Sequence, residues 1–422
     1  MTVVDLFAGP GGWSHALSVF GVRDIGLEWD AWACKTRSAA GQLTIQTDVA
    51  MYPVQPFIGR TRGFIASPPC QAWSMAGKRL GLVDQPLVHQ AVADLASGHD
   101  TRATLLAACH DERSLLTAEP MRYLHALNSV GDPEWVVMEE VPDVLPLWRQ
   151  YAAILRTWGF STWTGIINAA DYGVPQTRKR AILLASRTRT AVPPPPTHAK
   201  TAEPESLFGR GRARWVSMAE ALGWGATDRP VPTVCADGGP GGGPEPFPSG
   251  SCKTLTDARA RGTWTPHPDA ERVRPSRRES SGWAARPAGD RPADAPAPTF
   301  STDEHRWSWS LRSNNQSNAT VRRADEPAGT LFFGSRANEC TWVAETASGV
   351  PDDVQRVAPA PIKITAREAG VLQSFPADYP WRGNKGQTFS QIGNAVPPRL
   401  AAHLLAPHLN KPFNPDDFTL AA

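Results

Sequence analysis

The sequence lacks any run of about 18 apolar residues, the length that a membrane-spanning helix needs. Its N-terminus, Met-Thr-Val-Val-Asp, has neither a basic segment nor a long apolar core, so it predicts no signal peptide. The six cysteines form no CxxC pair and show no metal-ligand spacing. We therefore expect a cytoplasmic protein without a metal site, whose reduced thiols leave one available as a nucleophile.

An excess of charge of either sign is also missing. The chain has 43 basic and 41 acidic residues, so its net charge of +2 neither requires nor excludes a nucleic-acid partner. With 41% hydrophobic and 20% charged residues, the composition is typical of a globular protein, and 422 residues are enough for two domains.

Short apolar runs alternate with helical patterns over roughly the first 190 residues. The runs predict strands at 2–7, 24–28, 63–66, 135–139, 164–168 and 181–185. The helical patterns lie at 13–20, 87–95 and 113–127. This alternation favours an α/β fold with a mostly parallel sheet and crossover helices.

Four consecutive prolines at 193–196 mark a change in composition. The following segment is rich in Gly, Pro, Arg and Trp, and repeats the pattern Asp-x-Pro-x-x-Thr from positions 228, 294 and 325. Each copy predicts a turn and a short strand, so we expect a smaller, irregular β-rich domain. Helical patterns return at 366–373 and 399–405. The predicted boundaries are 1–186, 187–361, 362–410 and a tail at 411–422.

A glycine-rich turn, Asp5-Leu-Phe-Ala-Gly-Pro-Gly-Gly12, follows the first predicted strand. Glycines between a strand and a helix let a ligand approach the backbone at the helix N-terminus. Glu28, at the end of the second strand, suits the hydroxyls of a ribose, and Asp48 suits an adenine amino group. Alone, the turn fits a nucleoside cofactor or a purely structural bend.

A second loop, Ser67-Pro-Pro-Cys70-Gln-Ala-Trp-Ser74, follows the apolar residues 63–66. It therefore lies at the carboxyl end of a strand, where open α/β sheets bind ligands. Two prolines stiffen the chain before Cys70, whose thiol is strongly nucleophilic. A buried structural cysteine is the alternative, but the polar, proline-flanked setting favours a nucleophile.

Charged residues indicate two further candidate sites, one at the end of a predicted strand and one in an extended segment. Glu139 and Glu140 end an apolar strand, and neighbouring strand residues face opposite ways, so one carboxylate can enter a site while the other turns aside. Gln176, Arg178 and Arg180 share one face of an extended segment, and alternate arginines suit phosphate or base oxygens. Solvated strand edges are the alternative for both.

A polar turn at 391–398, Gln-Ile-Gly-Asn-Ala-Val-Pro-Pro, leads into the last predicted helix. With this turn, the glycine loop, the Pro-Pro-Cys-Gln loop, the Glu-containing strand end and the Gln-x-Arg-x-Arg segment, the chain resembles the cytosine-5 DNA methyltransferase family. The resemblance covers 1–186 and 362–410, and 187–361 fall where that family keeps its variable target-recognition domain. It implies a Rossmann-like methyltransferase domain that uses S-adenosylmethionine and acts on double-stranded DNA.

The resemblance carries roles over to individual residues. Cys70 matches the nucleophile, Glu139 matches the glutamate that contacts the cytosine ring, and Arg178 and Arg180 match the arginines near the base and its phosphate. The cofactor-facing positions are Phe7, Gly9, Gly11, Glu28, Asp48, Pro68 and Asn394. The family usually has Glu-Asn-Val where this chain has Glu-Glu-Val. The missing asparagine normally braces the catalytic loop, and an ionised Glu140 cannot donate a hydrogen bond.

Contacts with DNA are expected from both parts of the chain. The predicted contact residues are Gln71, Ser74, Gln176, Arg259, Arg274, Arg312 and Asn314. An arginine cluster at 259–278 suits phosphates, and the polar residues at 312–318 suit base edges in the major groove. A solvated linker is the alternative for the arginine cluster. Trp307, Trp309 and Trp342 are expected to pack a small core instead of touching bases.

Two other functions stay open at this point. A catalytically impaired relative of the same fold would bind DNA and cofactor, and only Glu140 favours it. A Rossmann oxidoreductase would leave the Pro-Pro-Cys-Gln loop and the arginine-rich segment unexplained. We expect a monomer, and the sequence does not imply a restriction endonuclease as partner.

Overall fold

The computed structural model describes residues 2–73, 80–206, 211–223, 272–273, 291–292, 307–313, 319–331, 340–346 and 362–413. The chain divides into two compact units, one made of Met1–Arg229 and Trp307–Ala422 and the other of Pro230–Arg306. The domain boundaries at 187 and 361 stay a prediction.

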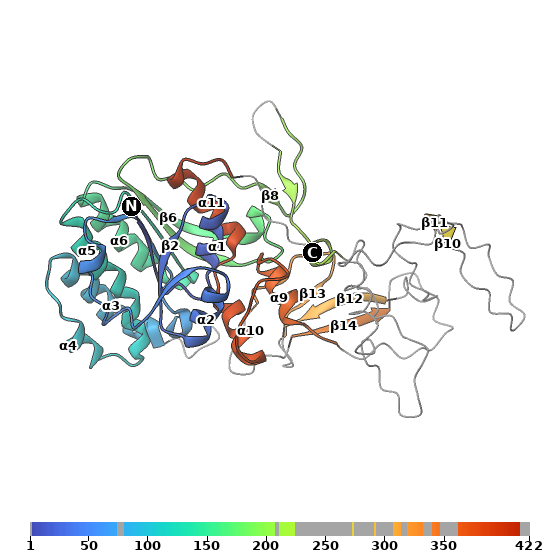
Figure 1. The fold of residues 1–422 in the computed structure, drawn as a ribbon, viewed down its shortest axis with the longest axis horizontal. Coiled ribbons are helices and arrows are strands. Elements are labelled where there is room, and N and C mark those ends of the chain that lie inside the picture. The colour runs from blue at the N-terminus through green and yellow to red at the C-terminus, as the bar shows by residue number, and fades with distance from the viewer. Residues whose placement is uncertain are drawn as a thin grey trace, which may run out of the picture. The chain divides into compact units, whose positions relative to one another are not determined.

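A seven-stranded sheet forms the centre of the first unit (Figure 1). Its strand order is β3-β2-β1-β4-β5-β7-β6, and every neighbouring pair is parallel except the two that β7 makes with β5 and β6. The strands are β1 Thr2–Leu6, β2 Asp24–Glu28, β3 Leu43–Gln46, β4 Thr61–Ala66, β5 Trp135–Glu140, β6 Ser161–Asn168 and β7 Lys179–Ser186. The predicted α/β fold with a mostly parallel sheet is confirmed.

Helices cover both faces of this sheet (Figure 1). One face carries α1 Gly12–Val19, α2 Ala31–Ala39 and α11 Pro398–Leu409, and the other carries α3 Leu80–Ala96, α5 Glu119–Asn128 and α6 Leu145–Thr157. Side chains alternate along β1, so Val3 packs with α1 and α11 whereas Val4 and Leu6 pack with α3, α5 and α6. A short helix, α4 Arg102–Leu106, and a 3₁₀ segment, η3 Glu112–Ala118, precede α5.

The C-terminal segment folds back onto the glycine turn. It contains α9 Ala366–Leu372 and α10 Lys385–Asn394 before α11. Tyr379 Oη donates to the Pro10 carbonyl at 2.6 Å. A Cβ on Gly12 would lie 2.1 Å from the Val396 carbonyl oxygen, so only glycine permits this contact between the two ends of the chain.

Some predicted elements need correction. The helix predicted at 113–127 divides into η3 and α5. The turn predicted at 391–398 begins inside α10, which starts earlier in a capping box formed by Asn384 and Gln387, so Asn394 is the last residue of a helix. Helices α2 and α6 were not predicted, although α6 buries Leu147, Trp148, Tyr151, Ala152 and Leu155 at helical spacing.

A second sheet lies in the segment expected to be β-rich. Its antiparallel strands stand in the order β13-β12-β14-β15, with bounds β12 Trp307–Arg312, β13 Val321–Arg323, β14 Thr341–Thr346 and β15 Ile362–Lys363. Trp309 and Trp342 are buried against Leu372 and Phe389 of the C-terminal helices, which confirms their predicted place in a small core. The side chain of Trp307 lies outside the described residues.

In the second unit, β10 Arg272–Val273 pairs antiparallel with β11 Arg291–Pro292. In the described part of the chain, no helix is long and apolar enough to cross a membrane, and no cluster of side chains is suited to hold a metal ion.

Candidate active site

The turn after β1 contains three residues with left-handed backbone. Phe7, Gly9 and Gly11 have φ angles of 58°, 53° and 100°. Glycine adopts this conformation without steric cost, but for Phe7 it is unusual and typical of ligand-binding sites. A Cβ on Gly9 would meet no protein atom within 4 Å, so the space beside this residue is open. The turn can therefore bring its backbone against a ligand.

Glu28 closes the neighbouring strand β2 and faces the same turn. Its Oε2 accepts a hydrogen bond from the Gly9 amide at 2.7 Å, and its Oε1 accepts one from the Asp30 amide at 2.7 Å. Burial raises the pKa of Glu28, and these two amides oppose that rise. The next residue, Trp29, is 73% exposed. Sequence reasoning missed Trp29, although a large aromatic ring beside a carboxylate that is predicted to bind a ribose is suited to stack on a base.

Asp5 is a second residue that sequence reasoning missed. It is fully buried within β1, and neither carboxylate oxygen has a hydrogen-bond partner among the described residues. Burial, followed by the charge of Asp24, raises its pKa well above the ordinary value. A buried carboxyl without a partner is costly, so Asp5 is suited to receive a cation or a donor from a ligand. The single acid in an otherwise apolar strand was the available clue.

The other predicted cofactor residues surround these. Asp48 lies two residues beyond β3, is partly buried, and accepts the Ala50 amide at 2.9 Å. Pro68 is buried after β4, and Asn394 is exposed at the end of α10. Because β2, β1 and β4 are neighbours, their carboxyl ends meet at one edge of the sheet.

Cys70 begins a short 3₁₀ turn, Cys70–Ala72, just beyond β4. Trp73 is fully buried, and its amide donates to the Cys70 carbonyl at 3.0 Å, so a buried side chain anchors the turn that carries Cys70. Burial raises the pKa of the Cys70 thiol to about 11, and the charge of Glu140 adds to the rise. Arg180 and Arg178 act in the opposite direction. Both arginines are thus close enough to favour the thiolate.

Glu139 and Arg180 form a buried ion pair next to this thiol. Arg180 Nε lies 2.8 Å from Glu139 Oε1, and the two side chains are only 9% and 8% exposed. The pair joins the end of β5 to the antiparallel β7. Its burial excludes the solvated edges that were the alternative for both motifs.

Glu140 occupies a more enclosed position than its neighbour. It is 2% exposed; its Oε2 accepts the Val141 amide, and its Oε1 has no partner among the described residues. Burial, followed by the charge of Glu139, raises the pKa of Glu140 well above the ordinary value. A protonated carboxyl can donate as well as accept a hydrogen bond, as an asparagine amide does. In its protonated form, Glu140 can therefore make the same kinds of hydrogen bond as the asparagine that the family usually has at this position.

Arg178 and Gln176 are both buried. Arg178 Nη1 donates to the Gly393 carbonyl at 3.1 Å, and burial, followed by the charge of Arg180, lowers the pKa of Arg178 to about 9. Gln176 has no exposed surface, and its Nε2 donates to Gln373 Oε1 at 2.6 Å. This position differs from the DNA contact that we expected, because the Gln176 amide links the β7 segment to the C-terminal helices.

The structure describes two of the other residues that we predict to contact DNA. Gln71 is exposed, and its Oε1 accepts from Arg113 Nη1 at 3.3 Å, a partner that sequence reasoning missed. Arg312 ends β12 and is partly buried. Ser74, Arg259, Arg274 and Asn314 lie outside the described residues.

The family model described as C-5 cytosine-specific DNA methylase matches residues 1–90, 102–213 and 297–409. The chain belongs to this family. It is therefore a DNA (cytosine-5-)-methyltransferase, and methyltransferases of this family generally use S-adenosylmethionine.

Individual proteins agree with this assignment. The methyltransferase is 26% identical to the Type II methyltransferase M.DdeI of Desulfomicrobium norvegicum, over 96% of this chain and 87% of the relative. It is 29% identical to M.HpaII of Haemophilus parainfluenzae, over 45% of this chain and 47% of that protein. A DNA modification methyltransferase encoded within an Escherichia coli prophage shares the fold, with a TM-score of 0.51 and 18% identity over 97% of this chain and 99% of that one.

Proposed function

We propose that this enzyme transfers a methyl group from S-adenosylmethionine to carbon 5 of a cytosine flipped out of double-stranded DNA, through a covalent adduct with Cys70. The observation that carries the proposal is the meeting of the Cys70 thiol with Glu139, Arg178 and Arg180. These groups share one electrostatic environment at the edge of the sheet that also holds the glycine turn. They combine a nucleophile, a carboxyl group and two cations.

The residues at the glycine turn fit the proposed cofactor. Open space beside Gly9 admits a ligand against the backbone, and the Glu28 carboxylate can accept hydrogen bonds from ribose hydroxyls. Trp29 offers an exposed ring for stacking on adenine, and the unpartnered carboxyl of Asp5 suits the amino group of the methionine part. When bound, S-adenosylmethionine supplies an electrophilic methyl group.

Cys70 provides the activation that the base needs, because carbon 5 of cytosine is a poor nucleophile. The thiolate adds to carbon 6, which makes carbon 5 the nucleophilic end of an enamine. Carbon 5 then takes the methyl group, loses its proton, and the carbon–sulfur bond breaks to return the thiolate. The net change is the replacement of the carbon-5 hydrogen by methyl, with release of one proton. Arg180 and Arg178 offset part of the rise that burial causes in the pKa of the Cys70 thiol, and so favour the attacking form.

Glu139 assists at the other side of the base. As the thiolate adds, negative charge develops at ring nitrogen 3, which Glu139 can protonate or hold by a hydrogen bond. Arg180 fixes the carboxylate at 2.8 Å and can also donate to the carbonyl oxygen of the base. A stacked base cannot reach these buried groups, so the cytosine must leave the duplex at a cost of a few kcal/mol.

The test is a transfer assay with labelled S-adenosylmethionine and DNA of mixed sequence. We expect label in DNA and 5-methylcytosine in its nucleoside digest. A catalytically impaired relative would bind cofactor and DNA without transfer. Label on adenine, or on the exocyclic amine of cytosine, would contradict the proposed chemistry.

We further propose that residues 187–361 select the target sequence, and that the enzyme acts on it as a monomer. The relatives named Type II methyltransferases favour modification of one specific sequence in a restriction-modification context. Within this segment, Arg312 stands at the end of a strand, next to the polar residues that continue to 318.

Substitutions in this segment should separate base reading from phosphate binding. We expect Arg312→Ala to relax the recognised sequence at one or two positions, because a well-placed bidentate contact discriminates by about 1–3 kcal/mol. Alanine in place of Arg274 should weaken binding to all DNA and reduce its salt dependence. Bisulfite sequencing of a methylated plasmid library measures the first effect, and binding at several salt concentrations measures the second. An unchanged target after exchange of 187–361 for a relative's segment would place recognition in the catalytic domain.

A further inference from the structure

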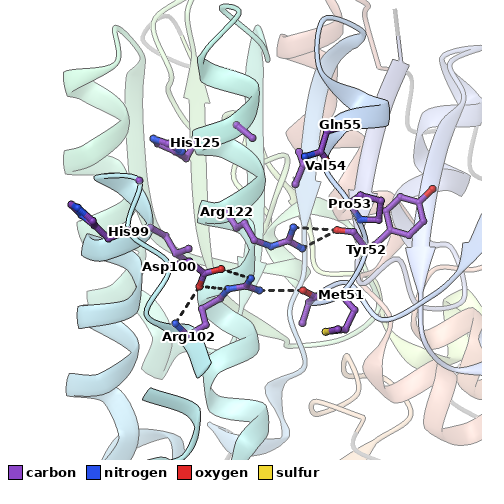
Figure 2. Close-up of a pocket in the computed structure, with 14 residues that line it drawn as sticks. Met51, Tyr52, Pro53, Val54, Gln55, His99, Asp100, Arg102, Arg122 and His125 are labelled. Carbon is purple, nitrogen blue, oxygen red and sulfur yellow. Dashed lines mark hydrogen bonds and ion pairs between the residues drawn. The ribbon is translucent and has the colours of Figure 1, made fainter. Parts of the chain in front are cut away.

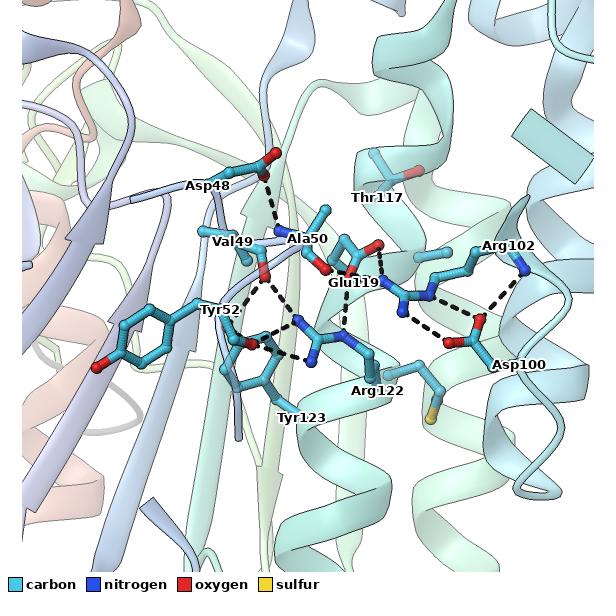
Figure 3. A network of polar contacts seen from close by, with 12 residues as sticks. Asp48, Val49, Ala50, Tyr52, Asp100, Arg102, Thr117, Glu119, Arg122 and Tyr123 are labelled. Carbon is cyan, nitrogen blue, oxygen red and sulfur yellow. Dashed lines mark hydrogen bonds and ion pairs between the residues drawn. The ribbon is translucent and has the colours of Figure 1, made fainter. Parts of the chain in front are cut away.

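The backbone of the loop that follows β3 is held by side chains from two helices (Figure 3). The Val49 carbonyl accepts from Arg122 Nη2 at 2.6 Å, and the Tyr52 carbonyl accepts from Arg122 Nη1 at 3.1 Å and Nη2 at 3.2 Å. The Ala50 carbonyl accepts from Arg102 Nη1 at 3.1 Å. Two guanidinium groups therefore fix three carbonyls of one short loop.

Two carboxylates hold these guanidinium groups in turn (Figure 3). Glu119 is 3% exposed and accepts from Arg102 Nη1 at 2.7 and 2.8 Å and from Arg122 Nε at 3.0 Å. Asp100 accepts from Arg102 Nε at 2.8 Å and Nη2 at 2.7 Å. Charge-assisted pairs of this bidentate kind fix orientation as well as position. The four side chains thus form one ordered support for the loop.

The backbone of Ala50 connects Arg102 to Asp48, a predicted cofactor residue. Ala50, whose carbonyl Arg102 binds, donates its amide to Asp48 Oδ1 at 2.9 Å and so orients that carboxylate. We infer that Arg102, Arg122 and Asp100 are positioning residues that hold Asp48 in place for the adenosine part of the cofactor. This inference rests on the proposed function, and it assigns these side chains an effect on cofactor affinity but none on the chemical step.

One of the four side chains that support the loop, Asp100, lies in a segment that the family model does not match. The family model matches up to 90 and resumes at 102, so Asp100 falls in the unmatched segment 91–101. This segment is ordered by its own contacts, because the side chain of Asp94 accepts from Thr101 Oγ1 at 2.6 Å and its carbonyl accepts from the His99 amide at 2.9 Å. The Asp100–Arg102 contact is therefore built by a segment outside the family match.

A cavity lies beside this loop and the two arginines. The cavity measures about 520 Å³ and is lined by loop residues such as Met51 and Pro53, by Leu95, and by Arg102 and Arg122 (Figure 2). Apolar packing holds the loop at Val49 and Val54, which are buried in the core, whereas Met51 between them is 80% exposed. The Val49 and Tyr52 carbonyls also accept from Tyr123 Oη, at 3.0 and 3.4 Å, whereas among the described residues only Arg102 donates a side-chain hydrogen bond to the Ala50 carbonyl.

The test compares Arg102→Ala with the wild-type enzyme. We expect the Kd and KM for S-adenosylmethionine to rise about tenfold, which is the scale expected for the loss of one charge-assisted hydrogen bond. The kcat and the KM for DNA should change by less than about twofold, because Arg102 does not contact the reacting groups. Arg102→Lys should recover part of the affinity, since an ammonium can still donate to the Ala50 carbonyl. Calorimetry measures the Kd, and methyl-transfer kinetics measure the other constants.

Arg62→Ala is the matched control, because it removes an arginine from an exposed ion pair with Glu134 that does not touch the loop. Asp100→Asn is a second variant for the case in which Arg102→Ala does not fold, and it should raise the Kd less. Wild-type cofactor affinity in whichever of the two folds would overturn the inference, as would an equal loss of kcat and DNA binding. A wild-type enzyme that binds no cofactor would instead contradict the proposed function.

Discussion

Replacement of Cys70 by alanine is expected to reduce methyl transfer to less than about one part in 10⁴, the scale on which removal of a covalent nucleophile acts. The cofactor should bind with near-normal affinity, because the glycine turn, Glu28 and Asp48 are left intact. The wild-type enzyme should be trapped on DNA that contains 5-fluorocytosine, since fluorine blocks the final loss from carbon 5 only after the thiol has added. The trapped complex should be absent for Cys70→Ala, and denaturing electrophoresis detects it.

The pH dependence of trapping gives a second measure of the same group. Burial raises the pKa of Cys70 to about 11, so less thiolate is present at neutral pH than for an ordinary cysteine. The trapping rate should therefore increase with pH across the neutral and mildly alkaline range. Cys109→Ala is the control, because Cys109 is a partly buried thiol outside the proposed site. Substantial methylation by Cys70→Ala would end the covalent hypothesis.

The fold could be predicted where the chain alternates clearly between short apolar runs and helices. The strands around the site are mostly apolar and end in an acidic residue, as β2 does at Glu28 and β5 at Glu140. Helix α10 was missed because its start depends on a capping box of polar residues, and its end carries the polar motif that we interpreted as a turn. That interpretation relied on the polar residues of the motif and overlooked the helical spacing of Phe389 and Ile392, which are buried one turn apart.

The site could be predicted where its residues follow strands directly, and not where tertiary contacts create it. Glu139 and Arg180 were identified separately, but their ion pair depends on β7 running antiparallel beside β5. The support of the Asp48 loop joins Arg102 and Glu119, which belong to different helices, and no local pattern marks them. Gln176 was assigned to DNA because it shares one face of an extended segment with Arg178 and Arg180, yet its partner Gln373 lies 197 positions further along the chain.

The two adjacent carboxyl groups have different surroundings. Glu139 lies 2.8 Å from a cation, Arg180. Glu140 forms no ion pair among the described residues; burial and the charge of Glu139 raise its pKa well above the ordinary value. This shift favours the protonated form of Glu140, and the charge that Glu140 carries when it ionises opposes ionisation of Cys70.

Glu139→Gln and Glu140→Asn should therefore differ widely in methyl transfer. We expect Glu139→Gln to lower kcat by about 10²-fold or more, the range for loss of a general acid or base, because an amide cannot supply a proton to ring nitrogen 3. Glu140→Asn should keep the wild-type rate or exceed it, since asparagine offers a donor and an acceptor as the protonated acid does. Its advantage should grow at alkaline pH, where it removes the charge that raises the Cys70 pKa. Single-turnover kinetics across pH measure both effects, with cofactor binding as the control for folding. An inactive Glu140→Asn beside an active Glu139→Gln would show that the two carboxyl groups have the opposite roles.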